Sequence, residues 1–360
     1  ALSFIFFLHL SNMYCNPTAK PLQFRKTLLK AQQFSFIIFF VFTVIKCQAP
    51  PHGPRKDRPA SAGETNSRKG RSMPNIVTKR PLNPTVTFME LDCPEIARKA
   101  RPGQFVMVRP DARGERIPLT IADYDPVRGT VTIMYQRVGV TTQKLDQLNA
   151  GDNVLDVVGP LGNPTEVEGV RRAMVIGGGV GSAIAYPQAK GLHAAQVQVD
   201  VIIGFRTKEL VFLEESFRRS CAHLYITTDD GTYGEKGFVS NKLEELLSEG
   251  HQYDLVIAIG PVPMMRSVAQ VTEPYGIKTL VSLNPLMVDG TGMCGCCRVR
   301  VGGQTKFACV DGPDFDGHQV DYEELMIRNS VYRAQENAAK EAHACNLQKM
   351  ADTARKGGEQ

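Results

Sequence analysis

The residues most able to do chemistry are the cysteines of one short window. The stretch "DGTGMCGCCRVRVGGQTKFAC" (residues 289–309) holds Cys294, Cys296 and Cys297 within four consecutive positions, and Cys309 follows two short alternating runs around a Gly-Gly pair. Those runs predict a β-hairpin that returns Cys309 to the C-x-x-C loop. Because the chain holds only nine cysteines in 360 residues, this clustering favours a metal site over a disulfide framework.

Spacing alone leaves four interpretations of this window open. Counted from Asp289 it reads D-x4-C-x2-C-x11-C, which follows the spacing of a plant-type [2Fe–2S] site with Asp289 in the first ligand position. A zinc site would combine the cysteines with the nearby His318. A disulfide would suit an oxidising compartment and is disfavoured in a cytosolic protein. A purely structural turn leaves the clustering unexplained.

The elements before this window predict a nucleotide-binding domain. The run "AMVIGGGVGSAIAYPQAKGL" reads as a buried strand, a glycine turn and a helix, a pattern that lets a phosphate approach the helix start. The apolar runs "VQVDVIIGF" and "YDLVIAIG" predict further strands of a doubly wound α/β sheet. Ligands of such sheets bind beyond the C-terminal strand ends, which fall at residues 177–181, 229–231 and 260–265.

Earlier still, short alternating strands predict a small antiparallel barrel. The runs "TVTFMEL", "QFVMVRP", "GTVTIMYQRV" and "NVLDVVGPLG" are separated by turn signals. In "RIPLTIADYD", Arg116 offers a guanidinium for a phosphate. In "QRVGVTTQKL", Gly139 allows close approach of a ligand, and Thr141 and Thr142 can cap a helix whose start suits a pyrophosphate. The two segments in this order are more specific than either alone.

This order of segments resembles the ferredoxin–NADP reductase superfamily, in which the barrel holds FAD and the α/β domain binds NAD(P)H. The resemblance implies an FAD site formed by Arg116, Pro118, Leu119, Thr120, Gly139, Thr141 and Thr142. It implies an NAD site formed by Gly177, Gly179, Gly181, Asp230, Gly231, Gly260 and Met264. NAD is expected over NADP because no arginine pair marks a 2′-phosphate site, although Arg206 and Lys208 leave NADP open. No acid–base residue is expected to be catalytic, since hydride transfer needs none.

The cysteine segment is similar to the small subunits of NADH-dependent ferredoxin:NADP oxidoreductases, also called sulfide dehydrogenase FAD/NAD-binding subunits. This resemblance spans residues 73–330 and implies that Asp289, Cys294, Cys297 and Cys309 hold a [2Fe–2S] cluster, with Cys296 a bystander. The carboxylate is expected to shift the reduction potential relative to an all-cysteine cluster.

The same resemblance implies an electron-transfer oxidoreductase subunit. Electrons would pass between NAD(H), FAD and the cluster to a larger glutamate-synthase-like flavo-iron–sulfur subunit in a heterodimer. Ferredoxin would be reached only through that subunit, with electron bifurcation. One alternative is a dihydroorotate dehydrogenase electron-transfer subunit, where a cysteine replaces Asp289. Another is a zinc-stabilised binding module without catalytic function.

Charge separates the first 72 residues from the rest. They hold eleven Lys/Arg and two Asp/Glu, whereas the remainder holds 31 Lys/Arg and 35 Asp/Glu. The net positive charge of the chain therefore belongs to its first 72 residues, and nucleic-acid binding by the remainder is not expected. Their apolar run, residues 34–45, is shorter than the roughly 20 residues of a spanning helix, so no stable membrane insertion is expected. We expect a non-native or disordered leader on a cytoplasmic enzyme, with export or organelle targeting as alternatives.

The predicted fold is therefore multidomain, combining β and α/β architecture. The expected parts are the leader 1–72, an FAD-binding antiparallel β-barrel 73–168, a doubly wound α/β NAD-binding domain 169–280, an iron–sulfur β-hairpin module 281–330 and a helical or disordered tail 331–360.

Overall fold

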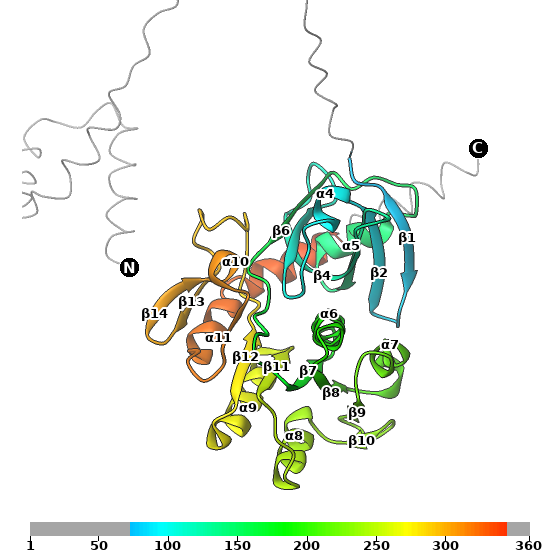
Figure 1. Cartoon of the computed structure of the whole chain (residues 1–360). Helices are drawn as coiled ribbons and strands as arrows, with labels where there is room; N and C mark the ends of the chain where they lie inside the picture. Colours follow the sequence, from blue (N-terminus) through cyan, green and yellow to red (C-terminus); the bar gives the residue numbers. More distant parts are fainter. Residues whose placement is uncertain (1–72, 344–360) are drawn as a thin grey trace, which may run out of the picture. The chain divides into compact units, whose positions relative to one another are not determined.

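The computed structural model describes residues 73–343 of the chain (Figure 1). The predicted leader, residues 1–72, and the end of the predicted tail, residues 344–360, lie outside the described residues. Among the helices of residues 73–343, none combines the length and the apolar character needed to cross a membrane.

The first part is a six-stranded antiparallel sheet in the order β1-β2-β5-β4-β3-β6. An antiparallel bridge between Asn75 and Asn153 joins its first strand to the segment before its last, so the sheet closes into a barrel. Inward side chains such as Ile133 and Leu91 are fully buried, as strand alternation requires. The elements are β1 (Ile76–Pro81), β2 (Val86–Asp92), α4 (Pro94–Ala97), β3 (Phe105–Arg109), β4 (Ile117–Asp125), β5 (Thr130–Gln136), α5 (Val140–Gln147) and β6 (Asp156–Leu161).

The second part is a seven-stranded sheet in the order β10-β9-β8-β7-β11-β12-β15, parallel except for its last strand. Its central strands are continuous apolar runs because helices cover both faces. Figure 1 shows α6 between this sheet and the barrel, with α8 and α9 on the opposite face. The elements are β7 (Arg172–Gly178), α6 (Gly181–Ala194), β8 (Gln198–Phe205), η2 (Lys208–Leu210), α7 (Glu214–Arg218), β9 (His223–Thr228), β10 (Glu235–Lys236), α8 (Val239–Ser248), β11 (Leu255–Ile259), α9 (Val262–Thr272), η3 (Glu273–Tyr275) and β12 (Lys278–Ser282).

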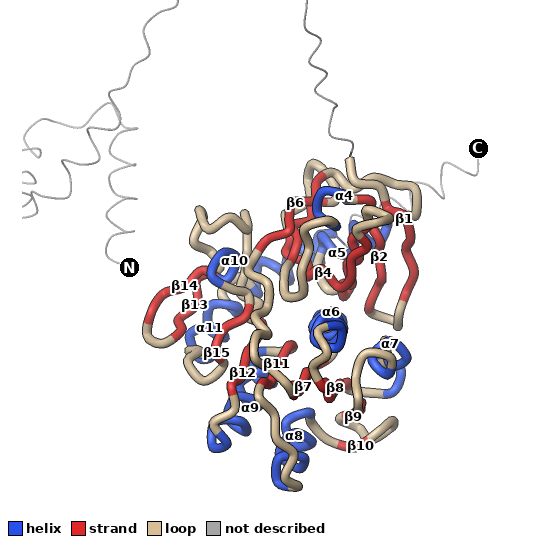
Figure 2. Tube along the Cα trace, in the orientation of Figure 1, coloured by secondary structure: helices blue, strands red, loops and turns tan. Residues whose placement is uncertain are grey.

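The third part is a two-stranded hairpin beside the edge of that sheet (Figure 2). Gly302 and Gly303 form its turn with φ of 57° and 73°, the left-handed conformation that a two-residue hairpin turn requires. The elements are β13 (Arg298–Val301), β14 (Gln304–Phe307), α10 (Ala308–Asp311), β15 (Asp314–Asp316) and α11 (Tyr322–Ser330). The predicted combination of barrel, α/β sheet and hairpin is confirmed.

The three parts share their apolar cores. One core contains Phe105 and Met107 of β3 together with Cys297, Cys309 and side chains of β7, β11 and α9. A second joins side chains of β2, β4 and β5 to α6 and the central strands of the parallel sheet. Only the third core lies within the barrel alone. The parts are therefore packed against one another through buried hydrophobic surface.

Candidate functional site

The hairpin brings two of the predicted ligands into contact. The Cys297 thiol donates to the Cys309 sulfur at 3.2 Å, and the Cys309 N–H donates to the Cys297 sulfur at 3.5 Å. Each cysteine is only 2% exposed. Burial, together with the Cys297 thiol, raises the pKa of Cys309 to about 12. A free thiolate is therefore disfavoured at this position, and a bound cation would favour the ionised form.

The other two predicted ligands form a second pair at the surface. The Asp289 carboxylate accepts from Thr291 N–H at 2.8 Å and from Cys294 N–H at 3.0 Å. The Thr291 N–H bond lowers the pKa of Asp289, and contacts with Cys294 contribute in the same direction. An ionised carboxylate thus lies beside the exposed Cys294.

The remaining candidates are Cys296 and His318. Burial and a contact with the Cys294 thiol raise the pKa of Cys296. The His318 ring bonds the Thr272 hydroxyl of α9 through Nε2 at 3.0 Å, so it does not join the cysteines. Across residues 73–343, no three Cys, His, Asp or Glu side chains gather around one point as a zinc ion requires. Two separate pairs fit a [2Fe–2S] cluster better, because each of its irons takes two protein ligands.

The segment 289–297, the ligand loop, lies directly on the barrel. Gly290 has φ of 76°, and a Cβ there would lie 2.7 Å from Met107 Cγ and 3.0 Å from Leu161 Cδ1. Met107 is the register partner of Pro118 on β4. The loop therefore touches the strand next to the one that carries the predicted flavin residues.

Successive side chains of β4 project alternately to the inner and the outer face of the barrel. Leu119 packs into the barrel core, whereas Pro118 and Thr120 pair with Met107 and Phe105, whose side chains belong to the core shared with the cysteines. Paired residues project on the same face of a sheet. Pro118 and Thr120 thus lie on the outer face, toward the ligand loop. Arg116 forms an ion pair with Asp156 at 2.9 Å.

The predicted helix cap is formed at α5. The Thr142 hydroxyl accepts from Gly139 N–H at 3.0 Å, and Thr141 is buried. A Cβ on Gly139 would meet only the Thr142 hydroxyl, at 4.0 Å, so the space in front of the helix start is open. The helix follows β5, the partner of β4, which places both predicted flavin segments on neighbouring strands.

Two of the predicted nucleotide loops, residues 177–181 after β7 and residues 260–265 after β11, pack closely against each other. A Cβ on Gly178 would lie 2.3 Å from Met264 Sδ, one on Gly260 would lie 2.9 Å from Met264 Cε, and one on Gly181 would lie 2.3 Å from the Ile259 carbonyl. Gly179 has φ of 56° and open space beside it. Gly178 is absent from the predicted set, although the "GGG" run marks it.

The remaining nucleotide residues shape the turns around these loops. A Cβ on Gly177 would lie 2.7 Å from Ser182 Cα, so only glycine allows α6 to start this close to β7. Asp230 accepts from the Thr232 N–H at 2.9 Å and from the Thr232 hydroxyl at 2.7 Å, and Gly231 has φ of 76°. Their loop follows β9, at the same edge of the sheet as the other two.

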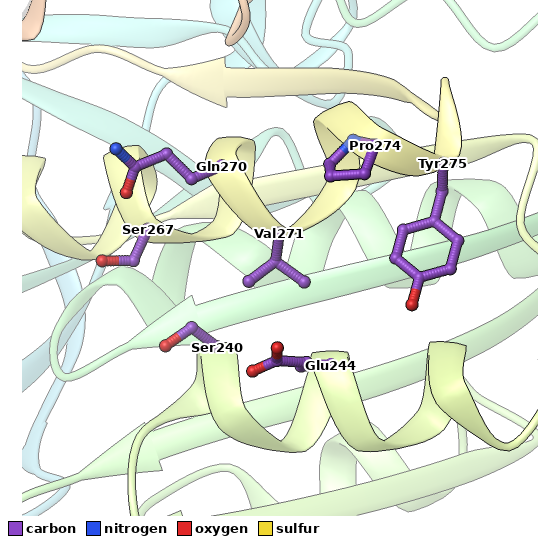
Figure 3. A pocket seen from close by; sticks show the side chains of 7 residues that line it. All are labelled: Ser240, Glu244, Ser267, Gln270, Val271, Pro274 and Tyr275. Carbon is purple, nitrogen blue, oxygen red and sulfur yellow. The ribbon is translucent and has the colours of Figure 1, made fainter.

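A groove of about 400 Å³ lies elsewhere, between α8 and α9 (Figure 3). Its lining contains none of the predicted cofactor residues. The lining residues are Ser240, Glu244, Ser267, Gln270, Val271, Pro274 and Tyr275.

Comparison with known proteins identifies the family. Residues 284–321 match the iron–sulfur cluster binding domain of dihydroorotate dehydrogenase B. The dihydroorotate dehydrogenase B (NAD(+)) electron transfer subunit homolog of Thermotoga maritima is 43% identical over 272 residues, covering 76% of this chain and 96% of the relative. The chain belongs to this electron-transfer subunit family.

Two further relatives agree with that assignment. An uncharacterized protein from the adh 3′ region of Clostridium beijerinckii is 50% identical over 275 residues, covering 74% of this chain and 93% of the relative. A solved structure of NADH-dependent reduced ferredoxin-NADP oxidoreductase, described in terms of flavin-based electron bifurcation, superposes with a TM-score of 0.72 at 43% identity, over 76% of this chain and 98% of that chain. The chain is thus an electron-transfer subunit of an oxidoreductase with more than one subunit.

Proposed function

We propose that this subunit passes electrons between NAD(H), FAD and a [2Fe–2S] cluster held by Asp289, Cys294, Cys297 and Cys309. The observation that carries the proposal is the contact of Gly290 with Met107, which places the ligand loop on the barrel face shared with Pro118 and Thr120. A bound flavin takes an electron pair from a nicotinamide and releases electrons singly, which suits a one-electron cluster.

The chain's own residues supply position and charge. The Asp289–Cys294 and Cys297–Cys309 pairs would each hold one iron. The outer face of β4 and the open start of α5 would hold the flavin, with Arg116, Leu119, Gly139, Thr141 and Thr142 as further contacts. The glycine turn after β7 and the Asp230 loop would hold NAD(H), with Met264 fixing the turn against the loop after β11.

Anaerobic reconstitution of the full chain with FAD, iron and sulfide tests this proposal. NADH is expected to bleach the flavin absorbance and to produce the EPR signal of a reduced [2Fe–2S] cluster, with NADPH much less effective. Cys309→Ser should abolish the EPR signal while NADH still bleaches the flavin. Cys296→Ser, the matched control, should retain both signals. An iron-loaded wild-type chain whose cluster stayed oxidised while its flavin bleached would contradict the proposal.

For the partner we propose a larger glutamate-synthase-like flavo-iron–sulfur subunit, with ferredoxin reached through it, in an electron-bifurcating complex in the cytoplasm. The relative described in terms of flavin-based electron bifurcation supports this choice. Cys294, Cys296, Cys297 and Cys309 form no disulfide among the described residues, which suits a reducing compartment.

Dihydroorotate dehydrogenase B is the second candidate complex, favoured by the match of residues 284–321. Both candidates need the same cofactors in this chain and differ in the partner. The proteins that co-purify anaerobically from the native host distinguish them: a glutamate-synthase-like flavoprotein supports the first, and a dihydroorotate-oxidising subunit supports the second.

A further inference from the structure

Two arginine side chains donate hydrogen bonds to the backbone carbonyls of two consecutive residues in the ligand loop. Arg328, half-buried in the last turn of α11, donates from Nη2 to the Cys296 carbonyl at 3.1 Å. Arg298 donates from Nη1 to the Gly295 carbonyl at 3.3 Å. These carbonyls belong to the two residues between Cys294 and Cys297. Positive charge therefore lies on the short segment that links Cys294 to Cys297.

Within residues 73–343 no carboxylate pairs with Arg328, whereas Arg300 and Arg266 pair with carboxylates of α11. Arg300 of β13 bonds Glu324 at 2.9 Å, and Arg266 of α9 lies 3.8 Å from Glu323. The Arg328 side chain is also half-buried, so water surrounds it only in part. An unpaired charge in such partly desolvated surroundings acts more strongly on its neighbours than one in water.

We infer that Arg328, assisted by Arg298, raises the reduction potential of the cluster in this loop. The inference rests on the proposed function. Every proposed ligand is anionic, and reduction adds a further negative charge, so a fixed cation stabilises the reduced state more than the oxidised state. Arg328 is a positioning residue, because it acts through the Cys296 carbonyl and through its charge rather than as a ligand.

The test is the midpoint potential of the cluster in the full FAD-loaded chain, followed by EPR during a redox titration. Arg328→Gln keeps a hydrogen-bond donor but removes the charge. Its reduced-to-oxidised ratio at a fixed potential is expected to fall about tenfold, which is about 59 mV for a one-electron couple. Arg328→Lys keeps the charge and should show a smaller fall. Arg300→Gln, the matched control, should leave the potential unchanged because its guanidinium is paired and exposed.

Iron content is measured for every variant. Equal potentials in wild type and Arg328→Gln at equal iron content would overturn the inference and leave the proposed function intact. If Arg328→Gln binds less iron, Arg298→Gln provides the second measurement: a smaller fall is expected, and an unchanged potential overturns the inference. A wild-type chain that takes up no cluster overturns the proposed function, and the inference with it.

Discussion

At the scale of single residues, the least expected group is the carboxyl of Asp314, where the three parts of the chain meet. Its Oδ2 accepts from the Thr165 hydroxyl, at 2.5 Å, and lies 3.5 Å from Gln188 Nε2 of α6. Its Oδ1 is shielded from solvent and has no hydrogen-bond partner among the described residues. Burial raises the pKa of this carboxyl above its ordinary value of 3.8. The neutral acid is therefore the form that suits the folded chain.

This shift predicts the direction of a pH effect on stability. Between the unfolded and the folded pKa, the folded chain binds more protons at Asp314 than the unfolded chain does. The Asp314 contribution to stability is thus fully present below pH 3.8 and is lost as pH rises through the folded pKa. Each unit of upward shift corresponds to about 1.4 kcal/mol at higher pH.

Asp314→Asn removes this titration while retaining an acceptor for Thr165. The free energy of unfolding of the variant, relative to wild type, is expected to increase as pH rises above 3.8 and to level off once pH exceeds the folded pKa of Asp314. Urea denaturation at several pH values measures it, with Asp321→Asn, a helix cap in solvent contact, as the control for a generic Asp to Asn change. A difference that does not vary with pH would show that folding leaves the pKa of Asp314 unchanged.

At the scale of elements, the ligand loop depends on its close packing against β3 and β6. Gly290→Ala would strain a backbone with φ of 76° and also place a Cβ against Met107 and Leu161. Gly303→Ala in the hairpin turn is the matched control, because its φ is 73° and nothing lies within 4 Å. Both changes cost about 1–3 kcal/mol of backbone strain, but only the first displaces the loop from the barrel.

We therefore expect Gly290→Ala to reduce both the iron bound per chain and the rate at which NADH reduces the cluster, by tenfold or more, whereas Gly303→Ala keeps both near wild type. Iron analysis and stopped-flow spectroscopy measure the two quantities. Equal losses in the two variants would indicate that backbone strain, and not the contact with β3, limits the site.

The same elements show what the sequence could predict. The Gly302-Gly303 turn and its alternating strands gave the hairpin, since two-residue turns carry a strong local signal. Strand β15 carries no such signal, because "DFD" joins the nucleotide sheet only through pairing with β12. Arg328 was missed for the same reason: its contact with Cys296 depends on where α11 packs, 32 residues further along the chain. Long-range packing of this kind leaves no periodic pattern in the sequence.

At the scale of the whole molecule, the shared cores predict that the barrel and the parallel sheet unfold together. Side chains from β2, β4 and β5 of the barrel lie in one apolar core with α6 and β7, and Lys190 of α6 bonds Asp123 of β4 at 2.7 Å. An opening of the barrel alone would expose that buried surface, which costs about 25 cal/mol per Å². Domains joined only by a polar interface would instead open independently.

Leu91→Ala tests this coupling because Leu91 is fully buried in the core that belongs to the barrel alone. The substitution is expected to destabilise the chain by about 2–5 kcal/mol. Because the unfolding is shared, the free energy of opening measured by native-state hydrogen exchange should fall by the same amount at the amides of β7 and β11 as at those of β5. This is expected even though β7 and β11 contribute no side chain to the mutated core. Protection of β7 and β11 that stayed at its wild-type level while that of β5 fell would show that the barrel opens by itself, and the shared core would then not couple the two parts.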